Sequence, residues 1–310
     1  YSTTFITEKI DPNEFALGEN NQEVFALYNN NPIHCMDMTD IDMCLESLTF
    51  YNKSKNILWL GNSQLHVINE KENDEKSASL MLFEKLFDKD IFLLTLSQPN
   101  ANLQEHFILY EYLSKKIDID ILILPIVFDD LRETNIRENL RQILDIKKIN
   151  TSIKKSKIGH KIISKINNDS NNLDNLLINT PQKKTEEFLE EKFSNYSGVW
   201  KNRDFLRVKL WQFLYNLRNK IFGINPQSIR SIIPQRYSDN ILALKTILKK
   251  SKDQNIKVLL YIPPLRSDVD IPYDKFEYKK FKNDIFKISE SKNIKFFNFD
   301  DTIPGKFWGF

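Results

Sequence analysis

Glycine is scarce in this chain: only 7 of its 310 residues are glycine, and they are scattered. Glycine-rich loops bind phosphates because their backbone N–H groups can approach closely, so this scarcity excludes a P-loop or a dinucleotide-binding loop. An excess of either charge is also lacking, since 44 Lys and Arg stand against 42 Asp and Glu, a formal charge of +2. This balance excludes a protein that follows the phosphates of a nucleic acid.

Cysteine is nearly absent, and the two residues present are Cys35 and Cys44. A small disulfide loop in an oxidising compartment and two free thiols are both compatible with this spacing. Together with His34 they supply three potential metal ligands, but no second ligand cluster follows and the spacing fits no zinc pattern. We therefore predict no metal site here.

Long apolar runs are absent as well. No run approaches the length of a membrane span, and residues 1–15 have neither the basic flank nor the apolar centre of a signal peptide. The sequence begins with Tyr1 instead of Met, so an anchor or signal upstream of Tyr1 is compatible with it.

Short apolar runs, by contrast, recur along the chain and alternate with patterns of helical spacing. Such alternation predicts a parallel sheet covered by helices on both faces, a three-layer α/β fold with about five strands. In these sheets ligands bind at the carboxyl ends of the strands, so the turns after the strands are where a site is expected. The strand-like runs are 57–60, 91–96, 119–127, 257–262 and 294–299, and the helical runs are 79–87, 103–116, 134–148, 240–250 and 276–289.

Two regions stand outside this rhythm. Residues 1–55 are interpreted as an N-terminal extension, and residues 56–310 as the α/β domain, interrupted by a helical insertion over 150–238. The insertion carries a basic, aromatic-rich helix at Arg203–Phe222. Such a helix can cover an active site or lie on a membrane surface, but a helix packed on the core with solvated basic residues is the interpretation we favour.

The most informative segment is the apolar run 57–60, which leads into Gly61, Asn62 and Ser63. Glycine lets the chain turn sharply, so the Ser63 hydroxyl would stand at the carboxyl end of the sheet, beside the N–H groups that open the next helix. Those groups stabilise an oxyanion, which makes Ser63 a candidate nucleophile. The alternative is that Ser63 only caps that helix.

The strand followed by Gly61-Asn62-Ser63-Gln64 resembles the first sequence block of the SGNH, or GDSL-type, hydrolase and acyltransferase superfamily. The resemblance covers residues 56–149 and 240–310. It is nearest to the membrane-associated branch that O-acylates cell-surface polysaccharides, similar to alginate O-acetyltransferases and teichoic-acid D-alanylation proteins. The resemblance implies a flavodoxin-like sheet, a nucleophilic Ser63, and oxyanion donors after the next two strands.

This chain departs from the family pattern in two places. The third-block Gly-x-Asn-Asp is replaced by Phe128-Asp129-Asp130, and the Asp-x-x-His pair expected after the last strand is missing, although Asp300 and Asp301 stand there. Either this pair lies beyond Phe310, or the protein lacks the usual base and binds without turnover. We favour the first explanation, because a domain that ended directly after its last strand would leave that edge uncovered.

Other polar residues in the turns complete the candidate site. Tentative oxyanion donors are Gln64, Asn100 and Asn102, and cleft candidates are His66, His106, Asp129, Asp130, Arg132 and Arg266. His66 is a weak candidate for the base, since its ring would lie along the helix that follows Ser63. The two arginines are interpreted either as ligands of an anionic sugar or acyl donor, or as surface ion pairs.

The function expected from these features is that of a serine-dependent esterase or O-acyltransferase, acting through an acyl-enzyme at Ser63 on an acylated cell-surface glycan or a related ester. The alternative is a catalytically silent glycan-binding or scaffold protein of the same fold. We expect no cofactor, no nucleic-acid partner and an extracytoplasmic location. The resemblance further implies a membrane-bound acyl-donor protein as partner, and a membrane anchor in a segment absent from this chain.

Overall fold

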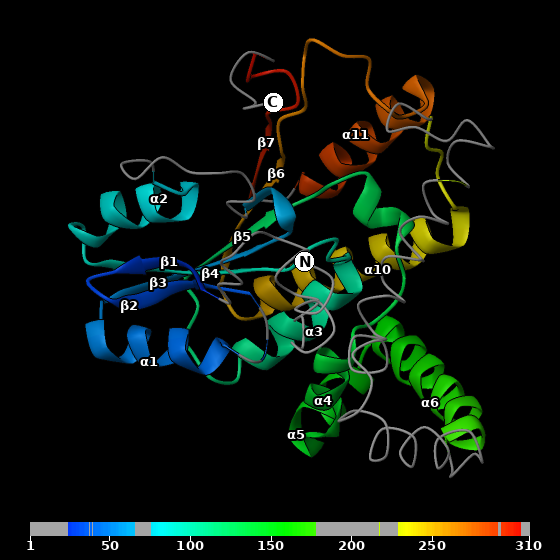
Figure 1. Ribbon diagram of the computed structural model, residues 1–310, viewed down its shortest axis with the longest axis horizontal. Coiled ribbons are helices and arrows are strands. Elements are labelled where there is room, and N and C mark those ends of the chain that lie inside the picture. The colour runs from blue at the N-terminus through cyan, green and yellow to red at the C-terminus, as the bar shows by residue number, and fades with distance from the viewer. Residues whose placement is uncertain are drawn as a thin grey trace, which may run out of the picture. The chain divides into compact units, whose positions relative to one another are not determined.

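The computed structural model describes residues 24–36, 38, 40–65, 76–177, 217, 229–290 and 293–304. They form a seven-stranded sheet in the order β1-β2-β4-β3-β5-β6-β7 (Figure 1). All five predicted strands are present, and neighbouring strands are parallel except β1 and β2, so an α/β fold with a mostly parallel sheet is confirmed. The strands are β1 (Val24–Tyr28), β2 (Asn31–Cys35), β3 (Lys55–Gly61), β4 (Ile91–Ser97), β5 (Ile121–Pro125), β6 (Lys257–Ile262) and β7 (Ile294–Asn298).

Helices flank the sheet, with α2 on one face and α1 and α3 on the other (Figure 1). The central strands are apolar and buried between these layers, as expected of parallel strands covered on both faces. Every residue of helix α3 is buried, and the helix packs against α10, α4 and α5. The helices are α1 (Ile41–Tyr51), α2 (Ala78–Phe87), α3 (Leu103–Leu113), α4 (Glu138–Asp145), α5 (Lys147–Lys154), α6 (Lys157–Leu177), α10 (Pro234–Asp253) and α11 (Lys275–Ser289).

Two strands were not predicted: β1 and β2 form a hairpin within the segment interpreted as an N-terminal extension. Its turn is Asn29-Asn30, and both residues have positive φ angles, 48° and 63°. Asparagine tolerates this left-handed conformation, which two-residue hairpins need. The hairpin extends the sheet, because β2 pairs with β4.

A disulfide bond joins Cys35 at the end of β2 to Cys44 in α1. The sequence was compatible with either a disulfide or two free thiols, and the structure contains the disulfide. Both sulfurs are buried, so the bond fastens the first helix to the hairpin within the core.

The strand order marks one edge of the sheet as special. Counted from β3, the five predicted strands lie in the order 2-1-3-4-5, so the chain leaves β3 to one side, forms β4, and crosses back to form β5 on the other side. Open α/β sheets bind ligands at the carboxyl ends of the strands where the order reverses, and these strands are β3 and β5 here. Ser63 follows the first of these two strands.

The chain divides into two compact units, residues 23–166 with 229–310, and residues 1–22 with 167–228. The sheet belongs to the first. The predicted insertion begins within this same core, since Ile153 of α5 and Ile158 and Ile162 of α6 are buried in it. The basic helix predicted at Arg203–Phe222 lies outside the described residues apart from Leu217.

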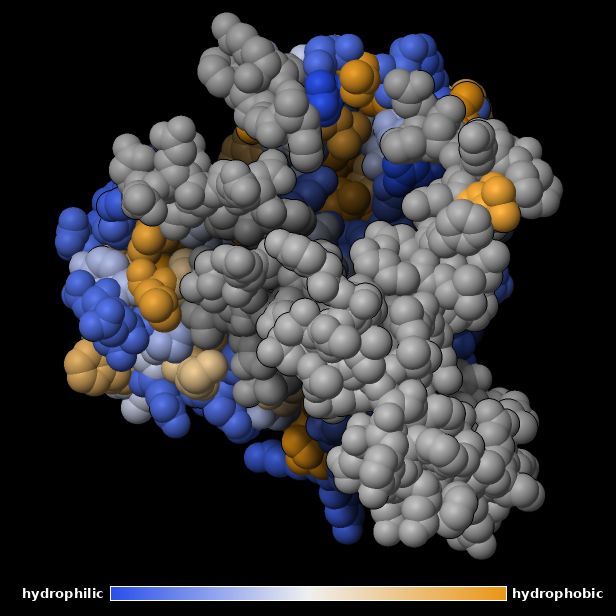
Figure 2. Space-filling model, viewed as in Figure 1, coloured by the Kyte–Doolittle hydropathy of each residue, from blue (hydrophilic) through white to orange (hydrophobic). Residues whose placement is uncertain are grey.

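The described surface is mixed. Figure 2 shows apolar groups separated by polar ones on the face in view. Exposed aromatic side chains include Phe50 on α1, Phe276 and Phe286 on α11, and Phe297 on β7. Among the helices of the described residues, none is both long enough and apolar enough to span a membrane.

Candidate functional site

Ser63 lies where β3 ends. Gly61 is the last residue of the strand, and a side chain there would overlap that of Leu65, so only glycine fits without a shift of its neighbours. Ser63 then opens a short 3-10 helix, η3 (Ser63–Leu65). Its side chain is partly buried, and within the described part of the chain its hydroxyl has no hydrogen-bond partner.

Asn62, and not Ser63, supplies the cap of this turn. The Oδ1 of Asn62 accepts a hydrogen bond of 3.0 Å from the backbone N–H of Gln64, and its carbonyl oxygen accepts one of 3.0 Å from Leu65. The Ser63 hydroxyl therefore does not cap this turn. Among the described residues nothing occupies this hydroxyl, so it can bond to another partner.

A buried hydrogen bond joins the turn after β3 to the loop after β5. The Nδ2 of Asn62 donates to Oδ2 of Asp130 over 2.8 Å, and both residues are buried. Asp130 belongs to a second 3-10 helix, η4 (Asp129–Arg132). Since β3 and β5 are the strands at which the order reverses, this bond joins the two turns at the reversal point, next to Ser63.

The Asp130 carboxyl holds its proton more tightly than an ordinary aspartate. Burial raises its pKa well above the usual value, and the nearby carboxylates of Asp129, Glu105 and Glu133 raise it further, while the Asn62 donor opposes this rise.

Paired aspartates also raise the question of a metal ion. The residues that the structure describes contain no group of three or more acidic, histidine or cysteine side chains able to hold one.

The tentative oxyanion donors are largely occupied. The N–H of Gln64 is donated to Asn62, and its side chain is exposed. Asn102 caps α3: its Oδ1 accepts from Gln104 and Glu105, and its Nδ2 donates to the Asn135 carbonyl. Both ends of its side chain are thus used within the fold.

Asn100, the remaining tentative donor, is exposed in the turn between β4 and α3. Its φ of 53° shows that it sits in the left-handed region, which asparagine tolerates at turns. The backbone here forms a tight turn, because the Ala101 N–H donates to the Gln98 carbonyl over 3.2 Å.

Two of the four histidines concern the candidate base. His66 lies outside the described residues. His106 is buried on α3, and neither ring nitrogen has a hydrogen-bond partner in the described structure. Burial lowers its pKa to about 3, with the Arg137 guanidinium adding to the effect, so the ring is neutral at physiological pH.

From the sequence His34 was considered only as a potential metal ligand, and the structure gives it other partners. It is buried on β2, with Nδ1 2.8 Å from the Ser79 hydroxyl and Nε2 2.6 Å from the Ser97 hydroxyl. The hydroxyl of Ser77 lies 3.0 Å from that of Ser79 and continues the chain of contacts. This network connects β2, the start of α2 and the end of β4. The sequence did not predict this network because it did not predict β2 as a strand.

Asp129 and Arg132 have partners within the protein. Asp129 accepts hydrogen bonds from Tyr273, at 3.0 Å, and from Arg132, at 3.3 Å, and it also pairs with Arg230. The Nε of Arg132 donates to the Ser231 carbonyl over 2.8 Å. These contacts fasten the chain before α10 onto η4.

Arg266 pairs with Asp268 in the exposed loop after β6, with contacts of 2.7 and 3.0 Å. The ion-pair alternative raised for the two arginines therefore describes their contacts in this structure. A pair as exposed as this one adds little to stability.

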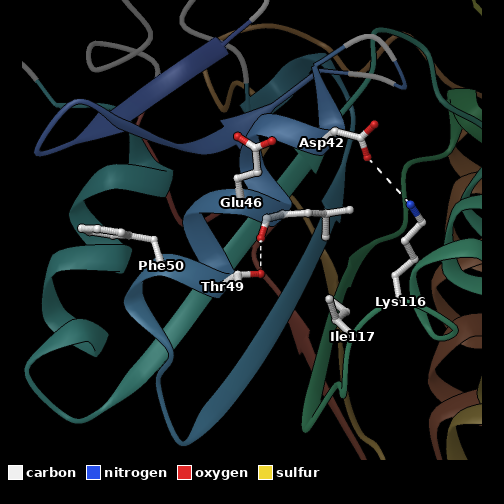
Figure 3. Close-up of a pocket in the computed structure, with 7 residues that line it drawn as sticks. Asp42, Glu46, Thr49, Phe50, Lys116 and Ile117 are labelled. Carbon is white, nitrogen blue, oxygen red and sulfur yellow. Dashed lines mark hydrogen bonds and ion pairs between the residues drawn. The ribbon is translucent and has the colours of Figure 1, made fainter.

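A surface pocket of about 660 Å³ lies away from these residues (Figure 3). It is bounded by α1 and by the residues just after α3, and Lys116 faces Asp42 across it at 3.8 Å. None of the candidate site residues lines it. The lining residues are Asp42, Leu45, Glu46, Thr49, Phe50, Lys116 and Ile117.

Comparison with known proteins adds no relative. No family model matches the chain, and neither a curated protein nor a solved structure matches it.

The buried His106 predicts a stability that falls in acid. Its folded-state pKa of about 3 lies below the ordinary value of 6.5, so the unfolded chain binds a proton that the folded chain does not. Stability from this group is thus lost as the pH falls below 6.5, by about 2 kcal/mol between pH 7.5 and pH 5. The measurement is urea unfolding at both pH values, for the wild type and for His106→Gln.

The variant serves to isolate this effect, because the raised pKa values of Glu105 and Asp130 act in the opposite direction and are common to both proteins. An equal pH dependence in His106→Gln and the wild type would contradict the prediction.

Proposed function

We propose that this chain is a serine-dependent esterase or O-acyltransferase with a flavodoxin-like sheet of the SGNH kind, acting on an acylated cell-surface glycan. One observation carries the proposal: the partly buried hydroxyl of Ser63 has no partner in the described structure, and it stands at the end of β3, where the strand order reverses. A hydroxyl that only supported the fold would be expected to bind a neighbouring backbone group.

The chemistry follows from this position. The Ser63 oxygen attacks the carbonyl carbon of the ester, a C–O bond forms, and the carbonyl electron pair moves onto the oxygen. The serine proton passes to a general base, a histidine in the resemblance. Collapse of the tetrahedral intermediate breaks the C–O bond to the sugar, whose oxygen takes the proton from the base, and leaves an acyl-enzyme. Water or a second hydroxyl then attacks the acyl-enzyme and frees Ser63.

The disulfide supports the extracytoplasmic location included in this proposal, because such bonds form and persist in oxidising compartments. A membrane-bound protein is the acyl donor that we propose as partner.

One observation favours a second function, a silent glycan-binding or scaffold protein. Within the described residues no histidine is hydrogen-bonded to Ser63: His34 is engaged by two serines, and His106 is buried without a partner. A binder would need no base and would leave Ser63 unreactive.

Labelling with a fluorophosphonate, followed by intact-mass analysis and peptide mapping, separates the two. We expect one adduct at Ser63, lost in Ser63→Ala and kept in Ser114→Ala, a partly buried serine at the end of α3 that serves as the control. The same measurement on a form extended beyond Phe310 tests whether the base lies there. If neither form reacts at Ser63, the esterase proposal is wrong and the binding alternative is favoured.

A further inference from the structure

A pocket of about 780 Å³ lies at the amino ends of β5, β6 and β7, at the opposite end of the sheet from Ser63. Three lysines from three different elements line it: Lys252 in the last turn of α10, Lys257 at the start of β6 and Lys295 in β7. A volume of this size is ordinary for a small-molecule site. No acidic side chain is among the described residues that line the pocket, so its charged groups are all of one sign.

The register of the sheet places Lys257 and Lys295 on one face, with Leu259 between them. Lys295 pairs with Leu259, and paired residues of neighbouring strands point to the same face. Lys257 precedes Leu259 by two positions, so its side chain shares this face. Ile121 of β5 pairs with Lys257 and extends the apolar surface. Two ammonium groups thus flank an apolar floor.

This face is not the one that α10 and α11 cover. Phe286 of α11 contacts Phe296 of β7, with their ring centroids 6.3 Å apart. Since successive residues of a strand alternate, Phe296 points towards the helix and Lys295 points away from it. Burial in β6 follows the same alternation, because Val258 is buried and Leu259 is only partly buried. The floor between the lysines is therefore accessible.

The three lysines form no ion pair within the described part of the chain. The Asp120 carboxylate, close to Lys257 in the sheet, instead accepts a hydrogen bond of 2.8 Å from the Asn56 N–H. The dipole of α10 favours a lysine in its last turn, which accounts for Lys252 but not for the two strand lysines. Ammonium groups that share a pocket repel one another, and a bound anion removes this repulsion.

We propose that this pocket binds a small acidic amphiphile, with a phosphate or carboxylate head group between Lys257 and Lys295 and an apolar body on Leu259 and Ile121. Lys252 adds a third positive charge at the same pocket. The apolar floor distinguishes this ligand from an inorganic anion, and the lysines distinguish it from a neutral lipid. The proposal is independent of the function proposed for Ser63, because the pocket lies at the other end of the strands.

Isothermal titration with octyl phosphate tests the proposal, with inorganic phosphate as the head group alone and octyl glucoside as the neutral chain. We expect the wild type to bind octyl phosphate saturably. Binding should be about tenfold weaker or more in Lys257→Gln/Lys295→Gln, because glutamine removes the charge that bonds to the head group. Lys279→Gln/Lys280→Gln is the matched control, since it removes the same charge from exposed positions of α11 and should bind as the wild type does.

Several results would overturn the proposal: no binding of octyl phosphate to the wild type, equal affinities in the two double variants, or octyl glucoside or inorganic phosphate bound as tightly as octyl phosphate. Binding to vesicles of phosphatidylcholine and phosphatidylglycerol, without binding of octyl phosphate, would assign the lysines to a membrane surface instead. All four substituted lysines are exposed, so thermal unfolding should give melting temperatures close to that of the wild type. A change in affinity then reports the pocket and not the fold.

Discussion

Replacing Asp130 by alanine is expected to lower the free energy of unfolding by about 2–3 kcal/mol. The change leaves the buried Nδ2 of Asn62 without its acceptor and opens a small void between the loops after β3 and β5. The turn that carries Ser63 then loses its anchor. Because a displacement of about 1 Å can slow a reaction by about a hundredfold, we expect fluorophosphonate labelling of Ser63 to slow by at least tenfold.

Conservative variants distinguish the loss of the hydrogen bond that positions Ser63 from the loss of side-chain volume at Asp130. In Asp130→Asn the new side-chain oxygen can accept from Asn62, so stability should stay within about 1 kcal/mol and labelling should stay close to that of the wild type. The reciprocal pair Asn62→Asp with Asp130→Asn reverses donor and acceptor and should retain the bond to the Gln64 N–H. Equal losses in Asp130→Asn and Asp130→Ala would show that the hydrogen bond does not position the serine.

Loss of the disulfide is the second large effect. Cys35 and Cys44 are separated by nine positions, and a ring of this size restricts the unfolded chain by roughly 2.5–3 kcal/mol. The double variant Cys35→Ala/Cys44→Ala should lose at least this much, since both side chains are buried. Urea unfolding of the variant and of the wild type provides the measurement.

Treatment with a reductant provides the control. It should lower the stability of the wild type and leave that of the double variant unchanged. The oxidised wild type should show no reactive thiol, because both cysteines of the chain are in the bond. Unfolding of the wild type that does not respond to reductant would contradict the prediction.

The central strands were predictable from sequence because burial on both faces makes them continuous apolar runs, such as that of β3. The hairpin of β1 and β2 was not, for β2 is short and contains Pro32 and His34, which weaken its strand pattern. As a consequence, the buried contacts of His34 with Ser79 and Ser97 could not be foreseen.

The candidate site was only partly predictable for a similar reason. The position of Ser63 after β3 follows from local pattern, whereas the partners of Asn62 and Asp129 depend on contacts across distant parts of the chain. Local pattern also cannot tell an amide that caps a helix, as Asn102 does, from one left without partners, as Gln98 is.

The bond between Asn62 and Asp130 has a kinetic consequence. The turns after β3 and β5 leave two different strands, but a buried hydrogen bond joins them. Neither turn can therefore move far without the other. Segments coupled in this way open as one cooperative unit. The backbone amide of Gln64, protected by the same asparagine, would then exchange its hydrogen only as fast as the loop after β5 moves.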